Sequence, residues 1–237
     1  MTGSRGLRTI KIGDKIIEEK DELIFLGVII DNKLKFKSHF NKVYDKVKKG
    51  LNGLLMAKNY LDYRSKLNIY HSLIHSHLSY CALIWLSSIT KKQLQTLKTL
   101  QKKAIRIIYN LRYNAHTDKY FEISKITKVD NIFEKDSLLL THKFHMWKLP
   151  KAIIKLFNDS IYDPNRLTRS QTSCVYKLKR NLKDGVLMHD IIKNWNNIDK
   201  SLRDEINYID FKSKITKMLN RYIDCDKENC YVCKHTG

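Results

Sequence analysis

Residues 9–30 have the apolar pattern of β-strands, beginning with the alternation of Thr9, Ile10, Lys11 and Ile12. Gly13-Asp14 marks a turn between two short strands over residues 9–17. A second apolar run, Leu23–Ile30, is interrupted only by Gly27 and ends at Asp31-Asn32. Because this run is short and rich in β-branched residues, it predicts a well-buried strand.

From about Ser38 the apolar period changes to that of a helix, and Ser38 is the predicted N-cap. A second helical run begins near Tyr63, and its pattern is compatible with a break near Ser76. The expected core positions of the first run are Phe40, Val43, Val47, Leu51, Leu54 and Leu55. Those of the second are Leu67, Tyr70, Leu73, Ile74, Leu78, Cys81, Ile84 and Trp85.

The segment Lys91–Tyr109 has the clearest helical amphipathicity in the chain. Its apolar arc consists of Leu97, Leu100, Ala104, Ile107 and Ile108. The opposite arc carries Lys91, Lys92, Lys98, Lys102, Lys103 and Arg106, and no acidic residue lies between Lys91 and Arg112. Two interpretations stay open, a solvated surface and a phosphate-binding surface. Unpaired like charges repel one another, which favours the phosphate-binding interpretation.

The remaining pattern predicts a mainly α protein with a small α+β C-terminal region. The expected elements up to Pro150 are a loop and short helix over 113–128 and a helix over 131–149. After them we expect a linker-like stretch between Pro150 and Pro164, strand or irregular structure over 168–187, and a helical pair over 187–223. The predicted domains are 1–35 with the strands, 36–150 with the helical bundle, 151–223 with the α+β region, and a Cys/His tail over 224–237.

Composition adds charge to this picture. In 237 residues, 45 Lys and Arg stand against 24 Asp and Glu, a formal net charge of +21 that points to a polyanionic partner. The hydrophobic share of 43% is enough for a core, so the whole chain is not a disordered tail. Five cysteines, an odd number, argue against a secreted disulfide scaffold, and no apolar run reaches bilayer length. We therefore expect an intracellular protein without a membrane partner.

Four segments, taken in order, resemble the C-terminal part of a reverse transcriptase from non-LTR (LINE-type, jockey-like) retrotransposons. They are Phe25-Leu26-Gly27-Val28-Ile29-Ile30-Asp31 with Leu34 and His39, the run from Leu73 to Trp85 with Tyr80-Cys81 and Trp85, Leu100-Gln101-Lys102-Lys103-Ala104-Ile105-Arg106, and Trp195-Asn196 with Phe211-Lys212. The resemblance implies that Phe25, Leu26 and Gly27 form the primer grip at the end of the palm. It also implies that the helices after it are the thumb.

The resemblance implies RNA or an RNA/DNA duplex as partner, together with the palm and fingers that this chain lacks. In that family, paired aspartates of a Tyr/Phe-x-Asp-Asp motif hold two metal ions for phosphoryl transfer. No Asp-Asp pair occurs in this sequence, and Asp31 is the only acid in the matched segment. We expect a truncated element copy that is inactive alone. If expressed, it would lie in the nucleus or in a cytoplasmic ribonucleoprotein.

Two further sets of residues have metal-ligand chemistry. Cys225, Cys230, Cys233 and His235 contain a Cys-x2-Cys step, which predicts either a zinc site or free thiols near a chain end. His71 and His75 share a helical face, and His77 is nearby, but a hydrogen-bonding role is the simpler interpretation.

Lysines also cluster on the first helix. Lys42, Lys46 and Lys49 share a face there and are candidate phosphate contacts, as are Lys91, Lys98, Lys102, Lys103 and Arg106 on the later helix. The functional alternatives are a stand-alone basic helical RNA- or DNA-binding protein and a basic interaction protein for acidic partners or membranes.

Overall fold

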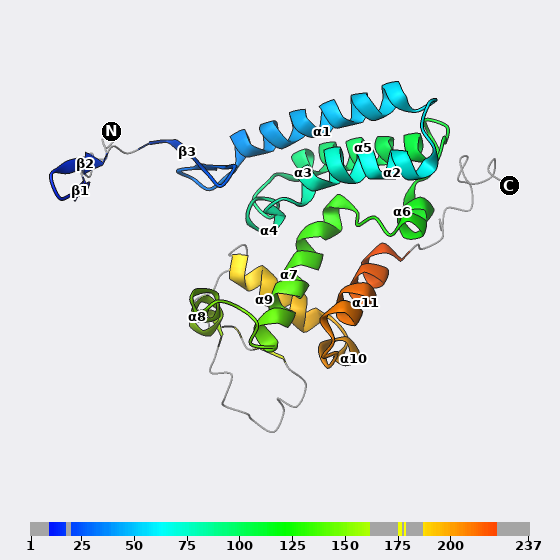
Figure 1. Cartoon of the computed structure of the whole chain (residues 1–237). Helices are drawn as coiled ribbons and strands as arrows, with labels where there is room; N and C mark the ends of the chain where they lie inside the picture. The colour runs from blue at the N-terminus through cyan, green and yellow to red at the C-terminus, as the bar shows by residue number, and fades with distance from the viewer. Residues whose placement is uncertain (1–9, 18–19, 162–174, 177, 179–186, 222–237) are drawn as a thin grey trace.

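The computed structural model describes residues 10–17, 20–161, 175–176, 178 and 187–221, and it is mainly helical, as predicted (Figure 1). Two antiparallel hairpins come first, β1 (Ile10–Ile12) with β2 (Lys15–Ile17) and β3 (Glu22–Phe25) with β4 (Val28–Asp31). The helices are α1 (Lys37–Ala57), α2 (Tyr63–Tyr70), the π-helix η1 (His71–His75), α3 (Ser76–Ser79), α4 (Ala82–Trp85), α5 (Lys91–Ile108), α6 (Asp118–Ser124), α7 (Val129–His145), α8 (Lys151–Ser160), α9 (Leu187–Asn197), α10 (Lys200–Arg203) and α11 (Tyr208–Asn220).

The prediction of one buried strand over Leu23–Ile30 is wrong. The segment is a hairpin whose turn is Leu26-Gly27, with φ of 45° and 83°. A two-residue connection with positive φ at both positions fits a type I′ turn, which suits the twist of paired strands. The residues of β3 and the turn are exposed, by 49–74% for Leu23, Ile24, Phe25 and Leu26, and within the hairpin only Val28 is buried.

The N-cap of α1 is Phe36 and not Ser38, which corrects the prediction, and Asp31 holds the loop that leads into the helix. The Asp31 carboxylate accepts hydrogen bonds from the backbone N–H groups of Lys35 and Lys33, each at 3.0 Å, and of Phe36. The chain then turns into the helix through Phe36, at φ 53°. These N–H groups, that of Lys35 above all, hold the pKa of Asp31 below its ordinary value. Asp31 therefore has a structural role in this fold.

The second helical run changes its hydrogen-bonding pattern in the middle. α2 passes into the π-turns of η1 and returns to α-helical geometry at Ser76, the position where the sequence was compatible with a break. This stretch packs against α1 very closely at Gly50. A Cβ atom at position 50 would lie 2.6 Å from the carbonyl oxygen of Leu73. Only glycine permits this approach of the two backbones.

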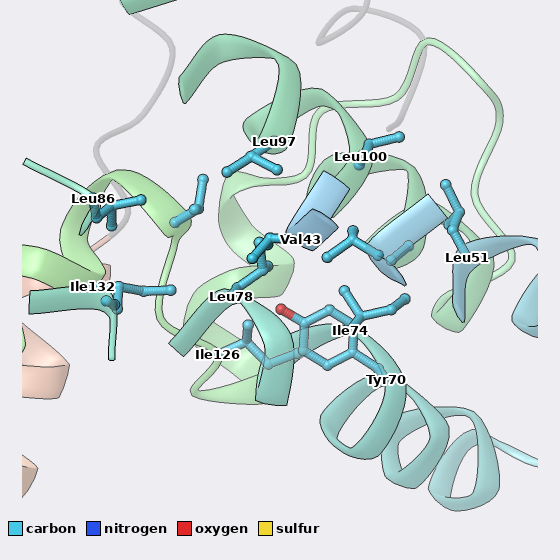
Figure 2. Packing of buried hydrophobic residues seen from close by; sticks show 14 of the residues in the cluster. Val43, Leu51, Tyr70, Ile74, Leu78, Leu86, Leu97, Leu100, Ile126 and Ile132 are labelled. Carbon is cyan, nitrogen blue, oxygen red and sulfur yellow. The ribbon is translucent and has the colours of Figure 1, made fainter. Parts of the chain in front are cut away.

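The first core lies where α1, the α2–η1–α3 run, α5 and the start of α7 converge, and Figure 2 shows side chains from all of them facing one another. Predicted core residues such as Val47, Tyr70 and Leu97 are completely buried. Three predicted core residues are instead about half exposed: Leu55, Leu73 and Ile84.

Gln101 is a polar residue at the centre of this core and is 0% exposed. Its Nε2 donates to the Tyr70 hydroxyl at 2.9 Å and to the Thr127 carbonyl at 3.0 Å, and its Oε1 accepts from the N–H of Val129 at 2.8 Å. A buried amide is tolerated when its hydrogen bonds are made. Gln101 thus joins α2, α5 and the beginning of α7.

Helix α7 connects the first core with the C-terminal part of the protein. Its Ile132 belongs to the first core, Leu138 packs with residues of α9 and α11, and Phe144 packs with residues of α8 and α9. The hydrophobic clusters therefore change within α7, whereas the predicted domain boundary was residue 150.

The linker-like stretch predicted after Pro150 is wrong for its first part. Residues Lys151–Ser160 form α8, which begins directly after Pro150, a residue well suited to a helix start. Phe157 of α8 stacks on Phe144 with ring centroids 4.2 Å apart. The strand or irregular structure predicted over 168–187 lies mostly outside the described residues, but Leu178 there forms one antiparallel bridge with Ile161.

No helix among the described residues has both the length and the apolar character needed to cross a membrane.

Candidate nucleic-acid interface

Helix α5 forms as predicted and begins with a capping box. The Thr90 side chain accepts from the N–H of Gln93, and the Gln93 side chain accepts from the N–H of Thr90. The six basic residues of this helix fall into two groups by exposure. Lys91, Lys92 and Lys103 are exposed, while Lys98, Lys102 and Arg106 are half-buried.

Two of the half-buried basic residues of α5, Lys98 and Arg106, have partners within the chain. The Lys98 ammonium lies 2.6 Å from the Asp130 carboxylate of α7. Asp118 of α6 is paired with Lys128 at 2.6 Å. Burial raises the pKa of Asp118, but Lys128, with Lys102 and Lys98 nearby, holds it below its ordinary value. The repulsion expected along the basic arc is therefore reduced by acids of other helices, which a pattern within α5 alone does not reveal.

Arg106 is also engaged within the chain. Its Nε donates to the backbone carbonyl of Ala115 at 3.0 Å, which holds the loop after α5 against the helix. Burial lowers the pKa of Arg106, since the charged form is partly removed from water. A variant that replaces Lys98, Lys102 and Arg106 together would break these contacts as well as remove charge.

The lysines of α1 lie beside a different set of neighbours. Lys42 donates to the carbonyl of Gly27 at 2.9 Å, and Lys46 lies close enough to His77 to reinforce the lowering of its pKa by burial. Lys46 and Lys49 are exposed. Among the predicted phosphate contacts in the described part of the chain, those with exposed side chains are Lys46, Lys49, Lys91 and Lys103.

The turn at Leu26-Gly27 is held by Lys42 of α1 and by Tyr80, the residue directly after α3. The Tyr80 hydroxyl donates to the Leu26 carbonyl at 2.5 Å, although the two residues are 54 positions apart in the sequence. The Lys42 ammonium donates to the Gly27 carbonyl. A hollow of about 240 Å³ lies between this turn and α1. The predicted primer-grip residues thus form the tip of a hairpin whose backbone is anchored to the helical core, while the side chain of Phe25 stays exposed.

Residues of the other segments that carry the resemblance make packing contacts and hydrogen bonds within the fold. The Trp85 indole donates to the Tyr80 carbonyl at 3.0 Å and packs edge-on against His39. Trp195 of α9 and Phe211 of α11 are in ring contact with centroids 5.9 Å apart. Asn196 beside them binds both the N–H and the carbonyl of Tyr176. These residues hold the fold together, so the resemblance rests on residues that determine packing.

Of the two sets of candidate metal ligands, the structure describes only the one with His71 and His75. Cys225, Cys230, Cys233 and His235 lie outside the described residues. His71 and His75 lie together in η1 with ring centroids 5.5 Å apart, and burial lowers the pKa of His75 to about 4. Within the described ranges no group of three His, Cys, Asp or Glu side chains is placed to hold a metal ion.

Sequence reasoning missed a hollow of about 940 Å³ among the described residues. It is bordered by the end of α1, the start of α2, the end of α5 and the loop that follows. Lys58 and Lys66 line it together with Lys103 and Arg106. Neither Lys58 nor Lys66 belongs to a basic stripe, so no local signal distinguished them from other lysines.

Comparison of the chain with family models, curated proteins and solved structures found no match.

Proposed function

We propose that this chain is the C-terminal part of a non-LTR retrotransposon RNA-directed DNA polymerase, which binds primer–template nucleic acid through basic helices but lacks the catalytic aspartates. The observation that carries the proposal is the hairpin formed by the Phe-Leu-Gly segment directly before a basic helical bundle. Its turn is bound by Tyr80, a residue of the second segment that carries the resemblance. Two segments that resemble the family independently thus meet in space.

The exposed apolar residues of β3 support the same proposal. A two-stranded sheet with an apolar, solvent-facing strand is a surface that other strands or another polypeptide usually cover. In a complete polymerase the palm would supply that cover. The hairpin would then join the palm to the thumb-like helices.

The proposed nucleic-acid contacts are phosphate contacts with little reading of bases. Exposed lysines on α1 and α5 offer flexible positive charges without aligned acceptors for base edges. Binding of this kind depends strongly on salt, because each neutralised phosphate releases counterions.

We expect paired substitutions on either basic helix to weaken duplex binding. One double variant is Lys46→Gln with Lys49→Gln on α1, and the other is Lys91→Gln with Lys92→Gln on α5. In each, the slope of log K for binding an RNA/DNA duplex against log salt concentration should become shallower by about two units, if each lysine neutralises one phosphate. Fluorescence anisotropy over a salt series measures this. All four side chains are exposed, so the melting temperature should stay unchanged.

The matched control is Lys151→Gln with Lys155→Gln, two exposed lysines of α8 that remove the same charge elsewhere. Its salt slope should stay close to that of the parent. Equal flattening in all three double variants would show attraction to net charge alone and would contradict a defined interface on α1 and α5.

We expect no polymerase activity from the chain alone. The two-metal reaction needs at least two carboxylates held together, and the sequence contains no Asp-Asp pair. Purified protein given primed poly-A, dTTP and Mg²⁺ or Mn²⁺ should incorporate no nucleotide, with an intact reverse transcriptase as the positive control. Incorporation that survives repeated purification would contradict this expectation.

The origin of the chain is tested separately from its binding. Translation of the genomic DNA upstream of the Met1 codon should reveal a Tyr/Phe-x-Asp-Asp motif, intact or decayed. If no such motif or other palm remnant lies there, the alternative of a stand-alone basic helical RNA- or DNA-binding protein is supported instead.

A further inference from the structure

The hollow of about 940 Å³ beside α1, α2 and α5 is surrounded by positive charge. Its cations are Lys58, Lys66, Lys103 and Arg106, and the residues of the described chain that line it include no aspartate or glutamate. The volume is in the range of small-molecule binding sites. A concave surface with four cations and no lining carboxylate attracts an anion.

Lys66 is the residue that most needs such an anion. It is only 3% exposed, and its ammonium donates to the Oδ1 atom of Asn110 at 2.9 Å. An ammonium has three donors, and a neutral amide oxygen balances none of its charge. Burial of a cation is unfavourable unless an anion or several acceptors compensate it. In the described residues no carboxylate lies within ion-pair distance of Lys66, although both Lys66 and Asn110 border the hollow.

The rest of the lining indicates what the anion is attached to. Leu51, Leu55 and Ile107 provide apolar wall, while the amides of Asn52, Asn59 and Asn110 provide donors and acceptors. Tyr113 completes the lining and is 90% exposed, so its ring is available for stacking. A hydrocarbon chain with one acidic group would leave the amides unpaired. A flat ring with polar edges, joined to a phosphate, matches the whole lining. The ring packs on the apolar wall and Tyr113, its polar edges bond with the amides, and the phosphate pairs with the cations.

We propose that this hollow binds an unpaired nucleotide of a single-stranded nucleic acid, with its base against the apolar wall and Tyr113 and its phosphate beside Lys66. The inference rests on the proposed nucleic-acid function and deepens it, since it names a second form of the ligand. A base within a duplex is stacked and paired and cannot enter the hollow. Duplex binding through exposed lysines and single-strand binding in the hollow are therefore separable.

The test compares a short unstructured RNA with the same RNA annealed to its complement. Lys66→Met removes the buried charge at nearly constant volume, and Tyr113→Ala removes the exposed ring. Each should weaken binding of the single strand about tenfold or more and change duplex binding by less than about twofold. Lys193→Met, at an exposed lysine of α9, is the matched control and should affect neither RNA selectively.

Thermal unfolding keeps the result interpretable. Lys66→Met should not lower the melting temperature, because it removes a poorly compensated buried charge. Tyr113→Ala alters an exposed side chain and gives a second measure if Lys66→Met fails to fold. Added single-stranded RNA should raise the melting temperature of the parent more than that of either variant.

The outcomes separate this inference from the proposed function. Duplex binding without any selective loss for the single strand in Lys66→Met and Tyr113→Ala would overturn the inference and leave the proposed function standing. Equal losses in these variants and in Lys193→Met would overturn it too, since charge alone would then explain binding. Failure of the parent to bind either RNA would overturn both.

Discussion

Leu97→Asp is expected to unfold the helical part of the chain, with a loss of more than about 4 kcal/mol in the free energy of unfolding. Leu97 is 0% exposed at the centre of α5, among side chains of the first core (Figure 2). An ionised carboxylate there would be surrounded by apolar groups, and even the neutral acid would leave a hydrogen-bonding group unsatisfied. Urea unfolding followed by far-UV circular dichroism measures the loss.

The control for Leu97→Asp is Gln95→Asp, which introduces the same residue on the exposed side of the same helix. It should change the free energy of unfolding by no more than about 0.5 kcal/mol. A Leu97→Asp protein with the stability of the control would contradict the burial of the apolar arc of α5 in the first core.

Gly50→Ala and Gly53→Ala are expected to change stability in opposite directions, although both replace a glycine inside α1. A Cβ at position 50 would lie 2.6 Å from the Leu73 carbonyl oxygen, so α1 and η1 would have to move apart, and we expect a loss of about 2–4 kcal/mol. A Cβ at position 53 has no neighbour within 4 Å, so alanine should add up to about 1 kcal/mol through its better helix propensity.

Each variant is the control for the other, because the intrinsic gain from Gly to Ala in a helix is the same at both positions. Thermal and urea unfolding under identical conditions measure the difference between them. Similar stabilisation by both substitutions would contradict the close packing of α1 against η1 at Gly50.

The helical elements were predictable because their signals are local. The apolar arc of α5 repeats with the helical period, and Thr90 and Gln93 supply a cap within three residues. The hairpin was harder to recognise. Leu26-Gly27 lacks the Asn-Gly or Asp-Gly signature of a type I′ turn, so Leu23–Ile30 resembled one continuous strand. The exposure of β3 contradicts the usual inference that an apolar run is buried.

The segment after Pro150 carries a helical signal of its own, since Ile153, Ile154 and Phe157 recur at helical spacing. Two prolines suggested a linker, yet α8 forms because its apolar residues bury against α7 and α9. Phe157, stacked on Phe144, is the clearest of these contacts. The spacing within residues 150–160 indicates an apolar helical face, but it does not show that α7 and α9 cover this face.

The composition alone indicates a large positive charge. The spacing of apolar residues indicates a mainly helical chain with one strongly amphipathic helix, because that spacing depends on residues within a few turns of one another. Which cations stay available to a ligand depended on contacts between remote residues. Lys98 is paired with Asp130, 32 positions away, and Lys66 is buried beside Asn110, 44 positions away. Burial and ion pairing are properties of the folded chain, since they arise only when separate helices pack together.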